Sequence, residues 1–392
     1  MNRLIVFVID IPVNDSLITY YRMDVLKNGG FGIRIIDISP VVNKNADFCV
    51  KRKVPDDIST IVCYTYADIK AEICAIPGHS IVFISFGNEY KHCFVLQRLA
   101  KKELHFGSMA LNSIYEGKTI KKNRKSFPLL SISRIVDYLY RRIPLSVLGI
   151  RPRDFFITNS EGEIENHKQN LCGDRTKFLV VNSNAYDEAL KGIKKERIIT
   201  KPYCVWLDTY SPYHPDLANL KIELDADNYY KPLRELFHWI ETTYGLAVIV
   251  AAHPKAEYEL HEDAYPGFHI IKNCTGLLVR DAEFVLTAIS TSFMYALVYM
   301  KPMIFINQDE VIKKLPQHAE AIHQLSVDTG QKEIELEHFN AMENKKELFD
   351  ECISMDEKRY IEMGRNYLAR DFDGTLSGKT SDSLILEFLD YF

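Results

Sequence analysis

Short apolar stretches alternate with longer amphipathic segments through most of the chain. Unbroken apolar stretches indicate strands that are covered on both faces, and apolar residues at helical spacing indicate helices between them. The expected strands are residues 3–10, 31–39, 60–66, 80–86, 176–184, 203–207, 246–252, 268–273, 283–289 and 303–307. The expected helices are residues 16–30, 67–78, 90–103, 131–144, 186–196, 230–245, 276–282, 292–301 and 381–392. Strands that alternate with helices form parallel sheets, so the pattern predicts an α/β fold.

Local signals fix the ends of several elements. In the first helix we expect Asp15 or Ser16 to be the N-cap and Gly29-Gly30 to end it. Gly245 is expected to end the helix over 230–245, and Asp225 to cap its start. From residue 308 onward we expect mostly acidic helix.

Length and composition describe a cytoplasmic protein of two domains. A chain of 392 residues is too long for one ordinary core. No apolar run reaches the roughly 18 residues of a membrane span, and Asp10 interrupts the N-terminal run, which is followed by no cleavage site. The 8 cysteines show no metal-binding spacing and suit reduced thiols.

The two halves of the chain carry opposite charge. Residues 1–160 have 23 Lys+Arg and 14 Asp+Glu, a net +9, whereas the whole chain has a net charge of –5. The densest basic run is KTIKKNRK, residues 118–125, which is either a solvated loop or a contact with an anionic membrane surface. We expect the basic half to meet an anionic partner, and we expect no nucleic-acid partner.

The stretch LAVIVAAHPK places two polar side chains at the end of a strand. Pro254 cannot continue a ladder, so the strand must end at His253. His253 and Lys255 are then delivered to the carboxyl edge of a parallel sheet, where open α/β folds bind ligands. The alternative is a plain strand end with an exposed histidine and lysine.

Two further polar groups follow neighbouring strands of the second half. Asp208 follows YCVWL, and Ser290-Thr291-Ser292 follows EFVLTAI. Because parallel strands share a carboxyl edge, we expect both groups to face the same cleft as His253. The serine cluster also opens a helix, whose free N–H groups would suit a phosphate, although helix capping alone could account for one of these residues.

Other common sites are absent from the sequence. The first strand is followed by neither GxGxxG nor GxxxxGK[ST], which argues against a dinucleotide or P-loop site there. No Asp-x-Asp follows a strand in a way that suggests a metal, since Asp225-Ala226-Asp227 precedes a helix. We therefore expect no metal and no cofactor.

The ordered motifs resemble those of GT-B glycosyltransferases, in particular bacterial enzymes that use CMP-activated acidic sugars (sialyltransferases and Kdo transferases). In that group an HP motif and a later Ser/Thr motif contact the nucleotide phosphate, and the matches here are His253-Pro254 and Ser290-Thr291-Ser292. DAEFVLTAISTSFMYALVYMKPMIFIN is similar to the strand, serine turn, helix and KP strand of many such transferases. The acidic D/E-D/E-G motif of several sialyltransferases has no clear copy.

The resemblance implies two Rossmann-like domains that face each other across a cleft. We expect an acceptor-binding domain over 1–185, a nucleotide-sugar-binding domain over 186–370, and a C-terminal helix over 371–392 that packs back toward the first domain. His253, Pro254, Lys255, Ser290, Thr291 and Ser292 would bind the donor.

The sequence indicates the residues that would catalyse formation of the new glycosidic bond less directly. Asp208 is the expected catalytic carboxylate, as general base or nucleophile, with a plain loop cap as the alternative. His214, in the same loop, and Glu163, in an acidic loop, are further candidates for the acceptor or cleft. His214-Pro215 is a second HP pair, and it shows how readily this motif arises by chance.

The expected function is transfer of a Kdo- or sialic-acid-type sugar from a CMP-sugar donor to a glycan or glycolipid of lipopolysaccharide, O-antigen or capsule. The protein would be cytoplasmic, or peripheral on the inner face of the cytoplasmic membrane. Alternatives on the same fold are a CDP-polyol phosphotransferase and a UDP-sugar transferase or epimerase. A non-catalytic assembly protein is the alternative from another class.

Overall fold

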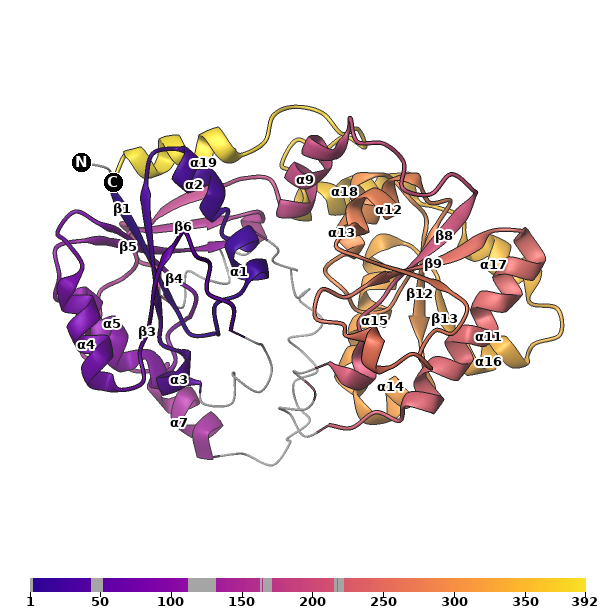
Figure 1. Cartoon of the computed structure of the whole chain (residues 1–392), viewed down its shortest axis with the longest axis horizontal. Helices are drawn as coiled ribbons and strands as arrows, with labels where there is room; N and C mark the ends of the chain where they lie inside the picture. Colours follow the sequence, from indigo (N-terminus) through magenta and orange to yellow (C-terminus); the bar gives the residue numbers. More distant parts are fainter. Residues whose placement is uncertain are drawn as a thin grey trace. The chain divides into compact units, whose positions relative to one another are not determined.

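The computed structural model describes residues 3–43, 52–111, 132–162, 164, 171–214, 217 and 222–392. Its internal contacts divide the chain into two compact units (Figure 1). Unit 1 is Met1–Val181 with Ser381–Phe392, and unit 2 is Asn182–Thr380.

Unit 1 is built on a parallel sheet. In its described residues the sheet is 7-stranded, with the order β3-β2-β1-β4-β5-β6-β7. The strands are β1 (Leu4–Ile9), β2 (Gly32–Asp37), β3 (Ser59–Val62), β4 (Ile81–Ile84), β5 (His105–Ala110), β6 (Phe155–Thr158) and β7 (Lys177–Val180). β5 and β6 are absent from the sequence prediction, and both lie inside the sheet.

Helices cover both faces of this sheet. Successive residues of a strand point to opposite faces, and they pack into two separate cores that each contain helix side chains. One core holds side chains of α1 (Asp15–Tyr20), α2 (Met23–Asn28) and α19 (Asp382–Asp390). The other holds side chains of α3 (Ser39–Val42), α4 (Tyr66–Ala75), α5 (Cys93–Ala100) and α7 (Ile132–Tyr140). The 3₁₀ turn η2 (Tyr90–His92) precedes α5.

The first helical segment differs from its prediction. A single helix was expected over 16–30, but Arg22 adopts a left-handed conformation with φ 50° and separates α1 from α2. The N-cap is Asn14, whose side chain accepts a hydrogen bond from the N–H of Leu17. The Arg22 guanidinium also binds Asp382 of α19 at 3.1 Å, so this break contacts the last helix of the chain.

Unit 2 repeats the strand order of unit 1. Its described residues form a 6-stranded parallel sheet with the order β10-β9-β8-β11-β12-β13. The strands are β8 (Tyr203–Leu207), β9 (Ala247–Ala252), β10 (His269–Lys272), β11 (Val285–Thr287), β12 (Met303–Asn307) and β13 (Glu333–Glu335). Both units therefore have the doubly wound arrangement, and the prediction of two Rossmann-like domains is confirmed.

Unit 2 has helices before, between and after its strands. They are α9 (Asn184–Gly192), α11 (Ala226–Tyr244), α12 (Thr275–Asp281), α13 (Phe293–Val298), α14 (Asp309–Lys314), α15 (Pro316–Thr329), α16 (Leu336–Ala341), α17 (Lys346–Cys352) and α18 (Glu357–Tyr367). Two 3₁₀ turns, η3 (Ser211–Tyr213) and η4 (Tyr258–Leu260), follow β8 and β9. As predicted, Asp225 caps α11, and Gly245 ends it in the left-handed conformation with φ 66°.

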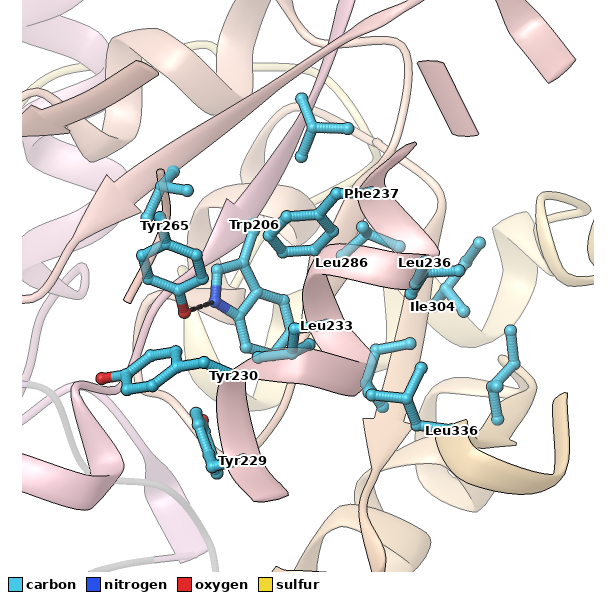
Figure 2. Close-up of a cluster of buried hydrophobic side chains, with 14 of the residues drawn as sticks. Trp206, Tyr229, Tyr230, Leu233, Leu236, Phe237, Tyr265, Leu286, Ile304 and Leu336 are labelled. Carbon is cyan, nitrogen blue, oxygen red and sulfur yellow. Dashed lines mark hydrogen bonds between the residues drawn. The ribbon is translucent and has the colours of Figure 1, made fainter. Parts of the chain in front are cut away.

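The core of unit 2 is rich in aromatic residues. Trp206 of β8 is fully buried among Leu233, Phe237 and Leu286 (Figure 2). Its indole N–H donates to the hydroxyl of Tyr265 at 2.9 Å, so the polar atom of this large side chain is satisfied inside the core. The same tyrosine hydroxyl donates a hydrogen bond to the carboxylate of Asp208, the residue that follows β8.

No helix in the described part of the chain is both long and apolar enough to cross a membrane.

Candidate functional site

In each sheet the order of the strands reverses once, and polar residues lie at both of these reversal points. The strand order reverses between β1 and β4 in unit 1 and between β8 and β11 in unit 2. Such points are where doubly wound folds bind ligands. Asp10 follows β1 and Asp208 follows β8, so each unit has an aspartate at its own reversal.

The three strand ends predicted for unit 2 do lie side by side. Leu207 of β8 pairs with Thr287 of β11 on one side and with Ala251 of β9 on the other. The residues that follow these strands therefore lie at one edge of the sheet, and they include Asp208 and His253.

The Asp208 carboxylate is buried in a network of hydrogen bonds. Its side chain accepts from Tyr258 Oη at 2.7 Å and from Tyr265 Oη at 3.1 Å, on different oxygens. The backbone N–H of His253 also donates to it at 3.4 Å, and the residue is only 3% exposed. Burial raises the pKa of the Asp208 carboxyl, although the hydrogen bonds from Tyr258 and from backbone N–H groups act in the opposite direction.

The ring of His253 is oriented by its own loop. Its Nδ1 accepts a hydrogen bond from the backbone N–H of Lys255 at 3.1 Å. In the neutral ring this contact assigns the proton to Nε2, which becomes a donor. Pro254 is exposed and ends β9, as expected, and Lys255 is half-buried.

His214 lies beside His253. The two ring centroids are 4.9 Å apart and the rings meet edge to face. The second HP histidine, which the sequence offered only as a possible acceptor or cleft residue, is thus brought into contact with the first. Its neighbour Pro215 lies outside the described residues.

The serine cluster has a different geometry from the one expected. The helix α13 begins only at Phe293, and no side chain caps it. Ser290 Oγ instead accepts from the N–H of Ser292 at 3.2 Å, and the N–H groups of Phe293 and Met294 bond to the carbonyls of Ser290 and Thr291. The expectation of free N–H groups at this turn is therefore wrong for Ser292, Phe293 and Met294, because their N–H groups bond to oxygen atoms of the turn itself. The hydroxyls remain on a half-buried to exposed surface.

Two predicted features cannot be placed. Glu163 and the basic run 118–125 lie outside the described residues. Within the described ranges, no group of three or more His, Cys, Asp or Glu side chains is arranged to hold a metal ion.

Unit 1 contains a polar cluster that the sequence did not indicate. Ser85 Oγ, at the end of β4, donates to Asp10 Oδ1 at 2.7 Å, and His92 Nε2 lies 3.1 Å from Asp10 Oδ2. Burial raises the pKa of the Asp10 carboxyl, but the hydrogen bonds with His92 and Ser85 outweigh it and leave this pKa below its ordinary value. Asp10 is therefore an ionised carboxylate with an exposed fraction of 14%. Its place directly after an apolar strand, like that of Asp208, was the available signal.

Comparison with known proteins identifies the fold. No protein-family model matches the chain, and no curated protein matches it by sequence. Among solved structures it is similar to the wall teichoic acid polymerase TagF, with 12% identity and a TM-score of 0.57 over 99% of this chain and 89% of that chain. It is also similar to CalG4, the calicheamicin glycosyltransferase, with 9% identity and a TM-score of 0.53 over 100% of this chain and 98% of that chain.

The chain has the GT-B fold. This confirms the predicted fold class. At these identities the likeness concerns the fold alone, so the CMP-sugar donor and the roles of individual residues stay predictions.

Proposed function

We propose that the chain is a nucleotide-dependent transferase whose donor site lies at the carboxyl edge of the unit 2 sheet. The expected reaction moves a glycosyl group, of Kdo or sialic acid type, from a CMP-activated donor to a glycan or glycolipid acceptor. The observation that carries the proposal is the fixed orientation of His253, whose Nδ1 is occupied by the Lys255 N–H at 3.1 Å. An Nε2–H donor at the end of a central strand suits an anionic oxygen of a nucleotide phosphate.

In this reaction the Nε2–H group of His253 would act on the leaving nucleotide phosphate. The bond between the sugar carbon and the phosphate oxygen breaks, and its electron pair goes to that oxygen. The acceptor hydroxyl oxygen forms the new bond to the same carbon, and its proton passes to water. Negative charge thus develops on the nucleotide phosphate, where a donor already in place stabilises the transition state more than the ground state. We assign this role to His253, with Lys255 and the Ser290–Ser292 hydroxyls as further contacts.

For Asp208 we propose a supporting role. A base or nucleophile must reach the reacting atoms. The Asp208 carboxylate is 3% exposed, and its two oxygens accept hydrogen bonds from Tyr258 and Tyr265. Its bond to the His253 backbone suits a residue that holds the histidine loop in place. Asp10 of unit 1, ionised and more exposed, is our candidate for binding an acceptor hydroxyl.

A second reaction on the same site is transfer of a polyol phosphate from a CDP-polyol. The fold likeness to TagF favours its inclusion, because that protein is a wall teichoic acid polymerase. In this case the acceptor hydroxyl oxygen forms a bond to the phosphorus that carries the polyol, and its proton passes to water. The bond from that phosphorus to the bridging oxygen of the diphosphate breaks, and CMP leaves with the electron pair on that oxygen. The same histidine would serve both reactions.

The test is a thermal-shift series with CMP, CDP, UMP, UDP and GDP on the wild type, on His253→Ala and on His338→Ala. His338 is an exposed histidine of α16, which makes it a matched control. We expect a cytidine nucleotide to raise the melting temperature of the wild type and the control but not that of His253→Ala. If no nucleotide stabilises the wild type, the transferase proposal fails. Supplying a CMP-sugar or a CDP-polyol and following CMP release then separates the two reactions.

A further inference from the structure

Three aromatic side chains lie at the start of two neighbouring helices of unit 1, α4 and α5 (Figure 1). Tyr66 is the first residue of α4, and its ring centre lies 5.2 Å from that of Phe94 in the first turn of α5. Tyr90, in the adjoining turn η2, is four residues before Phe94, so the two side chains lie on the same side of this helical segment. Tyr66 and Tyr90 are 48% and 60% exposed, and Phe94 is half-buried. We call Tyr66, Tyr90 and Phe94 the aromatic platform.

The backbone that carries the aromatic platform is held by hydrogen bonds. Thr65 and Asp68 form a capping box at the start of α4, which fixes the position of Tyr66. The backbone N–H of Tyr90 donates to the Asp137 carboxylate of α7 at 2.9 Å. Single exposed aromatic residues are common on soluble proteins, whereas a group of them on a fixed framework indicates a binding surface.

The aromatic platform borders the Asp10 cluster. His92, two residues after Tyr90 in η2, places its Nε2 atom 3.1 Å from Asp10 Oδ2. His92 is buried and Tyr90 is exposed, so one turn directs one ring inward to Asp10 and another ring outward to solvent. Because α4 follows β3 and η2 follows β4 of the same parallel sheet, the platform lies at the carboxyl edge that also carries Asp10. A ligand on the platform would therefore lie beside the carboxylate to which we assign an acceptor hydroxyl.

The charged side chains next to the platform are of both signs, and the acidic ones already have partners. Glu89 Oε2 lies 3.5 Å from Lys91 Nζ, and the Asp68 carboxylate accepts hydrogen bonds from two backbone N–H groups. The guanidinium of Arg98 lies 4.9 Å from the centre of the Phe94 ring. A surface of aromatic rings bordered by mixed charges suits an uncharged ligand better than a polyanion.

We propose that the aromatic platform stacks against the sugar rings of an uncharged glycan acceptor. A pyranose ring has an apolar C–H face and a rim of hydroxyl groups, and a tyrosine side chain offers an apolar ring and a polar hydroxyl in return. The terminal hydroxyl of the glycan would meet Asp10 while its next rings lie on Tyr90 and Tyr66. This inference rests on the transferase proposal, and it narrows the acceptor to glycans with sugar rings, because a poly(polyol phosphate) has no ring to stack and carries a negative charge on every unit.

The experiment measures binding of the labelled full chain to an array of immobilised uncharged oligosaccharides of hexoses and N-acetylhexosamines, with poly(glycerol phosphate) on the same array. We expect the wild type to bind at least one uncharged oligosaccharide. Tyr90→Ala and Tyr66→Ala should each weaken this binding by about threefold to tenfold, the loss expected for one aromatic contact. Tyr90→Phe should bind like the wild type, since it keeps the stacking ring and removes only the hydroxyl.

Tyr391→Ala is the matched control, because it removes a tyrosine ring that is 71% exposed at the other end of the sequence. This variant should bind oligosaccharides like the wild type, and all variants should keep the melting temperature of the wild type. Absence of binding to every uncharged oligosaccharide, or equal binding by Tyr90→Ala and Tyr66→Ala, overturns the proposal. Binding that depends on the two tyrosines but occurs only on poly(glycerol phosphate) also overturns it. So does self-association that these two variants abolish without glycan binding, which would assign the platform to a second copy of the chain.

The outcome is separable from that of the transferase proposal, because no nucleotide is present on the array. Stabilisation by a nucleotide without platform-dependent glycan binding would remove only the acceptor assignment. Platform-dependent glycan binding without stabilisation by any nucleotide would leave a glycan-binding surface and remove the transferase reaction.

Discussion

The hydroxyl of Tyr258 donates a hydrogen bond of 2.7 Å to Oδ2 of Asp208, fifty residues earlier in the chain. The bond joins η4 to the end of β8. The same carboxylate oxygen accepts from the backbone N–H of His253, at the end of β9. One buried oxygen thus ties together two strand ends and the loop that carries the candidate phosphate-binding histidine. We therefore expect the candidate site to lose its shape if this carboxylate loses its partners.

Tyr258→Phe tests how much this bond contributes. The change keeps the ring in place and removes the donor, so one oxygen of a buried carboxylate loses its closest partner. We expect the free energy of unfolding to fall by about 1–3 kcal/mol. Urea unfolding followed by circular dichroism measures it. The control Tyr64→Phe removes a hydroxyl from a ring that is 68% exposed and should stay within about 0.5 kcal/mol of the wild type. A Tyr258→Phe protein as stable as the wild type would contradict the network.

Asp10 and Asp208 should respond to pH in opposite directions. The folded-state pKa of Asp10 is lowered, so its ionised form stabilises the fold above the unfolded pKa, near 3.8, and this contribution is lost as pH falls through the folded value. The folded-state pKa of Asp208 is raised, so its contribution is fully present below the unfolded pKa and is lost as pH rises through the folded value.

Denaturant unfolding between pH 3 and pH 7 measures both effects. The stability difference between wild type and Asp10→Asn should shrink toward pH 3, whereas the difference between wild type and Asp208→Asn should shrink toward pH 7. If the two stability differences changed with pH in the same direction, one of these carboxylates would have an environment other than the one described.

Replacing His253 distinguishes its two ring nitrogens. A glutamine amide N–H can approach the position of Nε2, while an asparagine amide reaches only the position of Nδ1. If Nε2–H binds a nucleotide phosphate, His253→Asn should weaken binding by about tenfold or more, since a hydrogen bond to a charged group contributes about 1.5–3 kcal/mol. His253→Gln should keep part of the affinity. Calorimetric titration with the nucleotide that stabilises the wild type gives the numbers, and equal losses in both variants would exclude an Nε2 contact.

Most strands with unbroken apolar sequences were predicted, whereas β5, β6 and β13 were missed. AVIVAA of β9 and YCVWL of β8 have no polar interruption, and both were found. HFGSMA of β5 contains polar residues and a glycine, yet it is an interior strand. Its Ser108 hydroxyl is satisfied by the carbonyl of Ile84 at 3.0 Å on the adjacent strand, a contact that no local pattern reveals.

The candidate site shows the same division between local and distant information. The strand ends at Asp208 and His253 follow from local sequence and from the rule for parallel sheets. The donors to Asp208, Tyr258 and Tyr265, come from much later in the chain, and the contact between His214 and His253 depends on how two loops fold over one sheet edge. A role for Asp208 therefore required its burial to be known, and that burial is a tertiary property.

Gly107 of β5 provides a sharp test of the unpredicted part of the sheet. It pairs with Phe155 of β6, and a Cβ atom at this position would lie 2.3 Å from the Phe155 carbonyl oxygen and 2.4 Å from its ring. The backbone oxygen cannot move away without disturbing the ladder, so Gly107→Ala should cost about 1–3 kcal/mol of unfolding free energy or more. Gly78→Ala is the matched control, because a Cβ there meets nothing within 4 Å. That variant should be neutral or stabilised by about 0.4–1 kcal/mol, since alanine restricts the unfolded chain. Both are measured by urea unfolding, and a Gly107→Ala protein as stable as Gly78→Ala would mean that β5 and β6 pair in another register.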